Sequence, residues 1–121
     1  MTEQSRTAVK VDFEELRLGP TSYLFEGETR GAGISSFIVR TPPGKFVELH
    51  VHPYPETFVL LEGNGRWTAG DVVEELEREQ IIVVPPYTPH GFRNIGDVPL
   101  LVLSVHESPV VIQDWLDEEP A

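Results

Sequence analysis

The sequence contains no cysteine among its 121 residues. Disulfides, thiolate metal ligands and cysteine nucleophiles are therefore excluded. Any metal ion would be bound by His, Asp or Glu side chains, which suit Fe, Mn, Ni, Zn, Co or Cu as a divalent ion. The length is typical of one domain, so we expect a single domain over residues 1–121.

Positive charge is also scarce. There are 9 Lys and Arg residues against 20 Asp and Glu residues, which gives a net charge of −11. Because such a protein repels phosphate groups, neither a nucleic acid nor an anionic membrane surface is expected as a partner. No apolar run approaches the length that crosses a bilayer, and residues 1–10 show no signal-peptide pattern, so a cytoplasmic protein is expected.

Long helical patterns are lacking too. The 11 prolines and 10 glycines separate short segments that are rich in Val, Ile, Leu, Phe and Tyr, as β-strands are. Strands are expected over residues 21–25, 33–40, 46–52, 56–62, 65–69, 72–76, 81–84, 91–94 and 100–106. Many short strands separated by turns predict an all-β sandwich or barrel.

The expected barrel covers about residues 21–106, between an N-terminal arm and an acidic C-terminal tail. Helix is expected only as one turn within residues 11–17 and as a short C-terminal helix over residues 111–116. The run of acidic residues at 117–119 predicts a solvated tail. The first and last few residues are expected to fray.

Three histidines and one glutamate form a pattern of potential metal ligands. His50 and His52 are two apart in an expected strand, so their side chains point to the same face. Glu56 follows two prolines that interrupt the strand, and His90 follows a proline-rich turn. Three imidazoles and one carboxylate suit a divalent transition metal. A His-x-His pair alone, however, is more often structural or solvent-facing.

The spacing of these residues resembles the two motifs of the cupin family. The residues that match the motifs are Gly44, His50, His52, Glu56 and Gly63 in the first, and Pro85, His90 and Asn94 in the second. The resemblance implies a double-stranded β-helix, or jelly-roll, barrel. It also implies that His50, His52, Glu56 and His90 bind one divalent metal ion.

Two positions depart from the second motif. Glu79 and Tyr87 stand where the family pattern has glycine. Glycine would allow a positive φ at these positions, so both turns are expected to be reshaped. Neither departure involves one of the four ligands.

Strand alternation predicts the lining of a small-molecule pocket. Residues that share the inward face with the metal ligands are Phe46, Glu48, Phe58, Leu60 and Phe92. Tyr54 flanks a ligand-bearing turn and is a further candidate for the pocket, with plain packing as the alternative. An apolar, aromatic lining around one metal ion is typical of a small-molecule site.

Two residues are candidates for proton transfer. Glu48 would be a general base near the metal, unless a β-bulge turns it to solvent. His106 ends the last expected strand, where it could carry a proton or hydrogen-bond a loop.

Two classes of function remain open, and an enzyme is favoured over a binding module. The resemblance implies open metal positions at which a dioxygenase could bind an enol, diketone or phenolic substrate. A non-oxidative isomerase or decarboxylase is the alternative reaction. The second class is a non-catalytic small-molecule-binding or sensing protein. The resemblance also implies a homodimer, to which residues 11–25 could contribute a strand.

Overall fold

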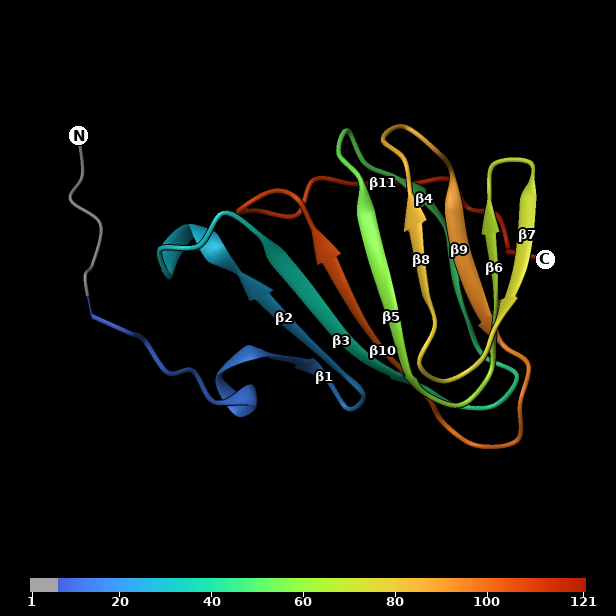
Figure 1. Ribbon diagram of the computed structural model, residues 1–121, viewed down its shortest axis with the longest axis horizontal. Coiled ribbons are helices and arrows are strands. Elements are labelled where there is room, and N and C mark those ends of the chain that lie inside the picture. The colour runs from blue at the N-terminus through green and yellow to red at the C-terminus, as the bar shows by residue number, and fades with distance from the viewer. Residues whose placement is uncertain (1–6) are drawn as a thin grey trace.

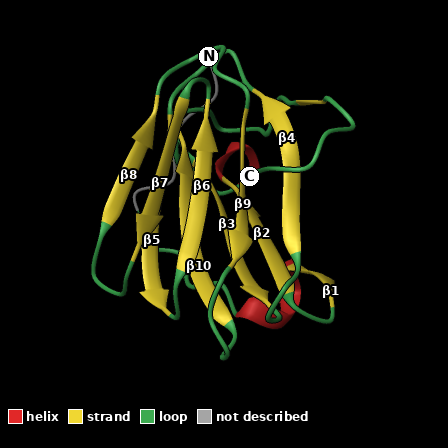
Figure 2. Ribbon diagram, turned by 90° about the vertical axis from the view of Figure 1, so that its right-hand side faces the viewer, coloured by secondary structure: helices red, strands yellow, loops and turns green. Residues whose placement is uncertain are grey.

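The computed structural model describes residues 7–121, whose strands form two facing antiparallel sheets (Figure 1). One sheet contains, in spatial order, β1 (Arg17–Gly19), β2 (Ser22–Glu26), β3 (Ser35–Thr41), β10 (Leu100–His106), β5 (Glu56–Glu62) and β8 (Ile81–Val84). The other contains β11 (Asp114–Trp115), β4 (Phe46–Val51), β9 (His90–Asn94), β6 (Gly65–Ala69) and β7 (Val72–Leu76). Figure 2 shows the five-stranded sheet in front of the six-stranded one.

The architecture is a jelly-roll barrel, so the predicted fold class is confirmed. All nine expected strands are present, with ends within two residues of the predicted ones. Helix is limited to two short 3₁₀ turns, Phe13–Leu16 and Gly27–Thr29. Within residues 7–121, no helix has the length and hydrophobicity needed to cross a bilayer.

The expected C-terminal helix is wrong, because this segment adds a short strand to the sheet. β-Branched residues at 110–112 disfavour a helix, and Trp115 pairs with His50 at the edge of β4. Leu116 N–H donates to Leu49 O at 3.0 Å, and Leu49 N–H donates to Glu118 O at 2.8 Å. The acidic tail is therefore bound along its backbone while its side chains are exposed. The fraying expected for the first few residues concerns residues 1–6, outside the described part.

An apolar core fills the end of the barrel away from the histidines. Trp67, Leu60 and Leu100 are completely buried there, and Trp67 stacks on Phe92 with ring centroids 4.8 Å apart. These side chains come from both sheets, since β5 and β10 belong to one and β6 and β9 to the other. Their contact fixes the separation of the two sheets.

The two turns with missing glycines keep a glycine-like backbone. Glu79 has a φ of 71° and Tyr87 has a φ of 58°. The hydrogen bond from Tyr87 N–H to His52 O, at 2.7 Å, holds the second turn against the ligand-bearing segment. Each left-handed residue costs roughly 1 kcal/mol, so the turns are strained but not reshaped.

Gly91 lies where the neighbouring strand comes closest to β9. A Cβ atom at this position would lie 2.5 Å from Val47 O and 3.0 Å from Glu48 O in β4. These atoms are backbone, so they cannot move aside as a flexible side chain could. By contrast, a Cβ atom at Gly33 would meet nothing within 4 Å.

We predict that Gly91→Ala lowers the free energy of unfolding by roughly 1–3 kcal/mol through overpacking. Gly33→Ala is the matched control, expected to change that free energy by less than about 0.5 kcal/mol. Urea unfolding of both variants measures the difference. Equal stability of the two variants would contradict the close approach of β4 and β9.

Candidate metal centre

Strand ends bring the four candidate ligands to one end of the barrel. His50 lies near the end of β4, opposite His90, which is the first residue of β9. The turn at residues 53–55 then carries the chain from one sheet to the other, where Glu56 begins β5. His52 lies just before this turn. The two prolines of the turn cannot continue the strand, so the ligands come from two facing sheets.

A bulge in β4 changes which of its side chains face inward. The register with β9 shifts between Val47 and His50, and both of these residues line the interior. The Glu48 side chain is exposed, so the expected alternation does not hold in β4 and the proposed general base lies outside the pocket. Phe46 packs instead under Arg93, whose guanidinium carbon lies 4.6 Å from the ring centroid.

Each of the three histidine rings is held by a hydrogen bond between its Nδ1 atom and a backbone carbonyl. The pairs are His50 with Glu48 O at 2.9 Å, His52 with Ile112 O at 3.0 Å, and His90 with Thr88 O at 2.7 Å. Because a carbonyl oxygen only accepts, the neutral rings carry their proton on Nδ1 and present an unprotonated Nε2. Such carbonyls are common partners of metal-binding histidines.

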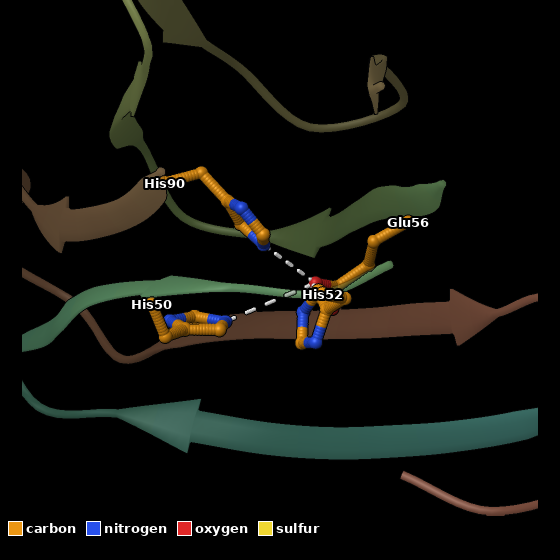
Figure 3. Close-up of side chains that lie close together, drawn as sticks. All are labelled: His50, His52, Glu56 and His90. Carbon is orange, nitrogen blue, oxygen red and sulfur yellow. Dashed lines mark hydrogen bonds and ion pairs between the residues drawn. The ribbon is translucent and has the colours of Figure 1, made fainter. Parts of the chain in front are cut away.

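The Nε2 atoms of these rings face one carboxylate oxygen (Figure 3). Glu56 Oε1 lies 2.8 Å from the Nε2 atoms of His52 and His90 and 3.9 Å from that of His50. The potential ligand atoms lie within 4.8 Å of one another, and all four residues are buried. Lone pairs that face one another repel, whereas a cation between them would be favourable. This donor set fits one divalent transition metal ion.

Burial and neighbouring groups keep the ligands in their metal-binding forms. Burial, followed by repulsion from His90, lowers the pKa of His50 to about 4. Burial by itself raises the pKa of Glu56, but the contact with His106, which the Tyr54 hydrogen bond leaves protonated on Nε2, holds this pKa well below its usual range. At neutral pH, His50 is therefore unprotonated and Glu56 is ionised, as metal coordination requires.

Tyr54 and His106 form a hydrogen-bonded pair beside Glu56. Ile112 N–H donates to the Tyr54 hydroxyl at 3.1 Å, and that hydroxyl lies 2.7 Å from His106 Nδ1. Burial raises the pKa of Tyr54, so the phenol keeps its proton and donates it to Nδ1. His106 therefore carries its own proton on Nε2. This atom lies 2.9 Å from Glu56 Oε2, although it is poorly aligned for a hydrogen bond.

A cavity of about 260 Å³ lies beside the ligands. His50, Glu56 and His106 contribute its polar groups on the metal side, and the other polar residues of the lining are Thr21, Ser22, Ser104 and Gln113. The apolar residues that line it, apart from Phe58 and Phe92, are Leu18, Phe37, Val39, Val47, Val102 and Trp115. The arrangement is that of a small-molecule site with its metal-binding groups on one side.

Some of the residues predicted to line the pocket do so, and others lie elsewhere. Phe58 and Phe92 line the cavity. Leu60 belongs to the apolar core, because it points inward nearer the opposite end of the barrel. Tyr54 stacks behind His52 with ring centroids 5.0 Å apart and interplanar angle 9°, so it supports the site from outside the cavity.

The C-terminal segment contributes to the site in ways that sequence reasoning missed. Ile112 O holds the ring of His52, and Gln113 and Trp115 line the cavity. The Trp115 ring lies 4.8 Å from that of His50. The sequence feature that pointed to this role was a tryptophan in an acidic tail. The contact of the Ile112 carbonyl could not be predicted, because every residue type has a backbone carbonyl.

We predict that His50→Ala combined with His52→Ala abolishes metal binding, because it removes two of the four donors. Elemental analysis of the purified protein measures the bound metal. Glu48→Gln is the matched control and should keep the parent metal content, since its exposed carboxylate takes no part in the site. A double variant with the parent metal content would contradict the ligand assignment.

The metal-free protein is predicted to lose stability as the pH falls from 6.5 towards 4, the ordinary and folded-state pKa values of His50. In this window the unfolded state binds a proton that the folded state excludes, so the free energy of unfolding decreases. The lowered pKa of Glu56 adds a loss in the same direction below its ordinary value of 4.5. Urea unfolding with a chelator present measures this slope. Gln cannot titrate, so His50→Gln should make the free energy of unfolding depend less on pH. An unchanged slope would contradict the attribution of this pH dependence to His50.

Comparison with known proteins gives both a family and relatives. The cupin domain family matches residues 37–106. The chain is 35% identical over 104 residues to Protein SchB of Streptomyces halstedii, covering 81% of this chain and 75% of that protein. It is 36% identical over 74 residues to an uncharacterized protein of Methanocaldococcus jannaschii, covering 60% of this chain and 59% of that protein.

Structures of oxalate decarboxylase have a similar fold. The Lactobacillus farciminis enzyme, solved as a formate complex, matches with a TM-score of 0.73 and 25% identity, covering 78% of this chain and 30% of that chain. The Bacillus subtilis enzyme, studied for its Mn(II) centres, matches with a TM-score of 0.73 and 25% identity, covering 78% of this chain and 27% of that chain.

This chain therefore spans less than half the length of those decarboxylases. The buried donor set and the manganese-containing neighbour both support a single divalent transition metal ion as the cofactor. Since the family match extends over more than half of the sequence and the fold agrees with it, this protein belongs to the cupin family.

Proposed function

We propose that this protein is a metal-dependent enzyme acting on a small, largely apolar molecule that coordinates the metal through oxygen atoms. The proposal depends on one observation, the cavity of about 260 Å³ with His50 and Glu56 in its wall. A molecule in this cavity would lie against the metal-binding groups. Four protein ligands on a six-coordinate ion would leave two positions for other donors.

The lining of the cavity favours an enol, a diketone or a phenol over a small dicarboxylate. Among the described residues, no Lys or Arg lines the cavity, and its walls are mainly aromatic and aliphatic. With Glu56 and three neutral imidazoles as its ligands, a divalent ion would carry one net positive charge, so a bound dianion would keep one negative charge that no Lys or Arg side chain of the lining compensates. A flat apolar ring with adjacent oxygen atoms would instead gain from burial of its faces.

The proposed reaction is a dioxygenation. The bound metal would supply coordination of the substrate oxygen and of O₂. The protein would hold the ion with His50, His52, His90 and Glu56. Phe58 and Phe92 would exclude water from the reacting carbon atoms, and His106 Nε2 would hold or move a proton beside Glu56 Oε2.

A non-oxidative decarboxylase or isomerase is the second candidate. The similarity in fold to oxalate decarboxylase favours it, and His106 would then deliver the proton that such a reaction needs. Oxalate itself is a poor match for this cavity, because no Lys or Arg side chain of residues 7–121 lines it. A sensing protein would use the same cavity without turnover.

The setting that we propose is a cytoplasmic homodimer. β1 forms one edge of the six-stranded sheet, so its free side is available for pairing with a second chain. The net charge of −11 makes a nucleic acid or an anionic membrane an unfavourable partner.

The test is O₂ uptake by metal-loaded protein with a panel of catechols, 1,3-diketones and oxalate. We predict uptake with at least one apolar member and none with oxalate. Protein stripped of metal and the double variant His50→Ala with His52→Ala are the inactive controls. Metal-dependent turnover without O₂ uptake would favour the non-oxidative reaction. Tight binding of a panel member without any turnover would favour a sensor.

A further inference from the structure

Strand β10 crosses from the apolar core to the metal centre along one inward face. Its buried residues alternate as Leu100, Val102, Ser104 and His106. Leu100 and Val102 belong to the core, and Val102, Ser104 and His106 line the cavity. One strand therefore places two polar side chains along the wall of a mainly apolar cavity.

The hydroxyl of Ser104 lacks a hydrogen-bond partner among residues 7–121, although the side chain is only 3% exposed. Other buried serines nearby differ. Ser36 Oγ donates to Ser104 O at 2.7 Å, and Ser35 Oγ donates to Ser108 O at 2.8 Å. An unsatisfied buried hydroxyl is unfavourable, and in a native protein it calls for a specific explanation.

His106, the other polar residue of β10 in the cavity wall, lies beside the proposed metal ligand Glu56. His106 Nε2 lies 2.9 Å from Glu56 Oε2, and the backbone of His106 pairs with that of Glu56. Ser104 pairs with Phe58, the residue two positions further along β5. Residues i and i+2 of a strand lie on the same face about 7 Å apart. The Ser104 hydroxyl therefore lies about 7 Å further along the cavity than the position of Glu56.

We propose that Ser104 determines specificity by donating a hydrogen bond to an oxygen atom of the ligand remote from the metal. The ligand class follows from the geometry and depends on the proposed function. It is a planar, apolar molecule with chelating oxygens at one end and an acceptor oxygen about 7 Å away, as in a two-ring catechol with a distal carbonyl.

The binding test uses two rigid catechols of similar size. In 6,7-dihydroxycoumarin a carbonyl lies at the end remote from the catechol, whereas 2,3-dihydroxynaphthalene has no distal oxygen. Calorimetry of the metal-loaded protein measures both affinities. We predict that Ser104→Ala weakens binding of the coumarin about 3–10-fold, the loss of one neutral hydrogen bond, and changes that of the naphthalene less than twofold.

A second measurement needs no ligand. Because no described protein group bonds to the Ser104 hydroxyl, Ser104→Ala in the metal-free protein is expected to melt no lower than about one degree below the parent. Ser36→Ala is the matched control, because it removes a hydroxyl that is bonded, and it should melt lower. A Ser104→Ala protein that melts as low as Ser36→Ala would show a hydrogen-bond partner within the protein and overturn the proposal.

The two arms separate failure of this inference from failure of the proposed function. Metal-dependent binding of the naphthalene reports on chelation in the cavity alone. If the naphthalene binds but Ser104→Ala leaves the coumarin affinity unchanged, then Ser104 bonds only to water and the inference is wrong while the proposed function stands. If neither compound binds the metal-loaded protein, both are contradicted.

Discussion

The metal end of this barrel depends on how one buried carboxylate oxygen is surrounded. Glu56 Oε1 has the Nε2 atoms of His52 and His90 at 2.8 Å, and both rings are oriented by backbone carbonyls. Without a cation, this cluster of acceptors in the interior is unfavourable. Metal binding relieves that cost, so the ion and the folded state stabilise each other.

Several otherwise unrelated features of the chain serve this one arrangement. The bulge in β4 turns His50 inward and brings the Glu48 carbonyl to its Nδ1 atom. The C-terminal segment supplies the Ile112 carbonyl for His52 and, through its N–H, orients Tyr54. The apolar core holds the two sheets at a fixed distance, which keeps ligands from opposite sheets in register.

The strands and the ligand set were predictable because each depends on local spacing. Alternating apolar residues between turns specify strands. The spacing from His50 to Glu56 identifies the ligands whatever conformation the turn between them adopts. The bulge was not predictable, since it is a shift in the pairing of β4 with β9, strands far apart in the sequence. The role of the tail was missed for a similar reason. Ile112 acts through its backbone, which every residue type possesses.

X-ray absorption at the metal edge tests the central claim most directly, because it reports the ligands of the bound ion in solution. Coordination by His50, His52, Glu56 and His90 predicts three imidazole nitrogens and at least one oxygen at roughly 2.0–2.2 Å, with the outer-ring scattering of three histidines. A first shell of oxygens with fewer than two imidazoles would contradict it.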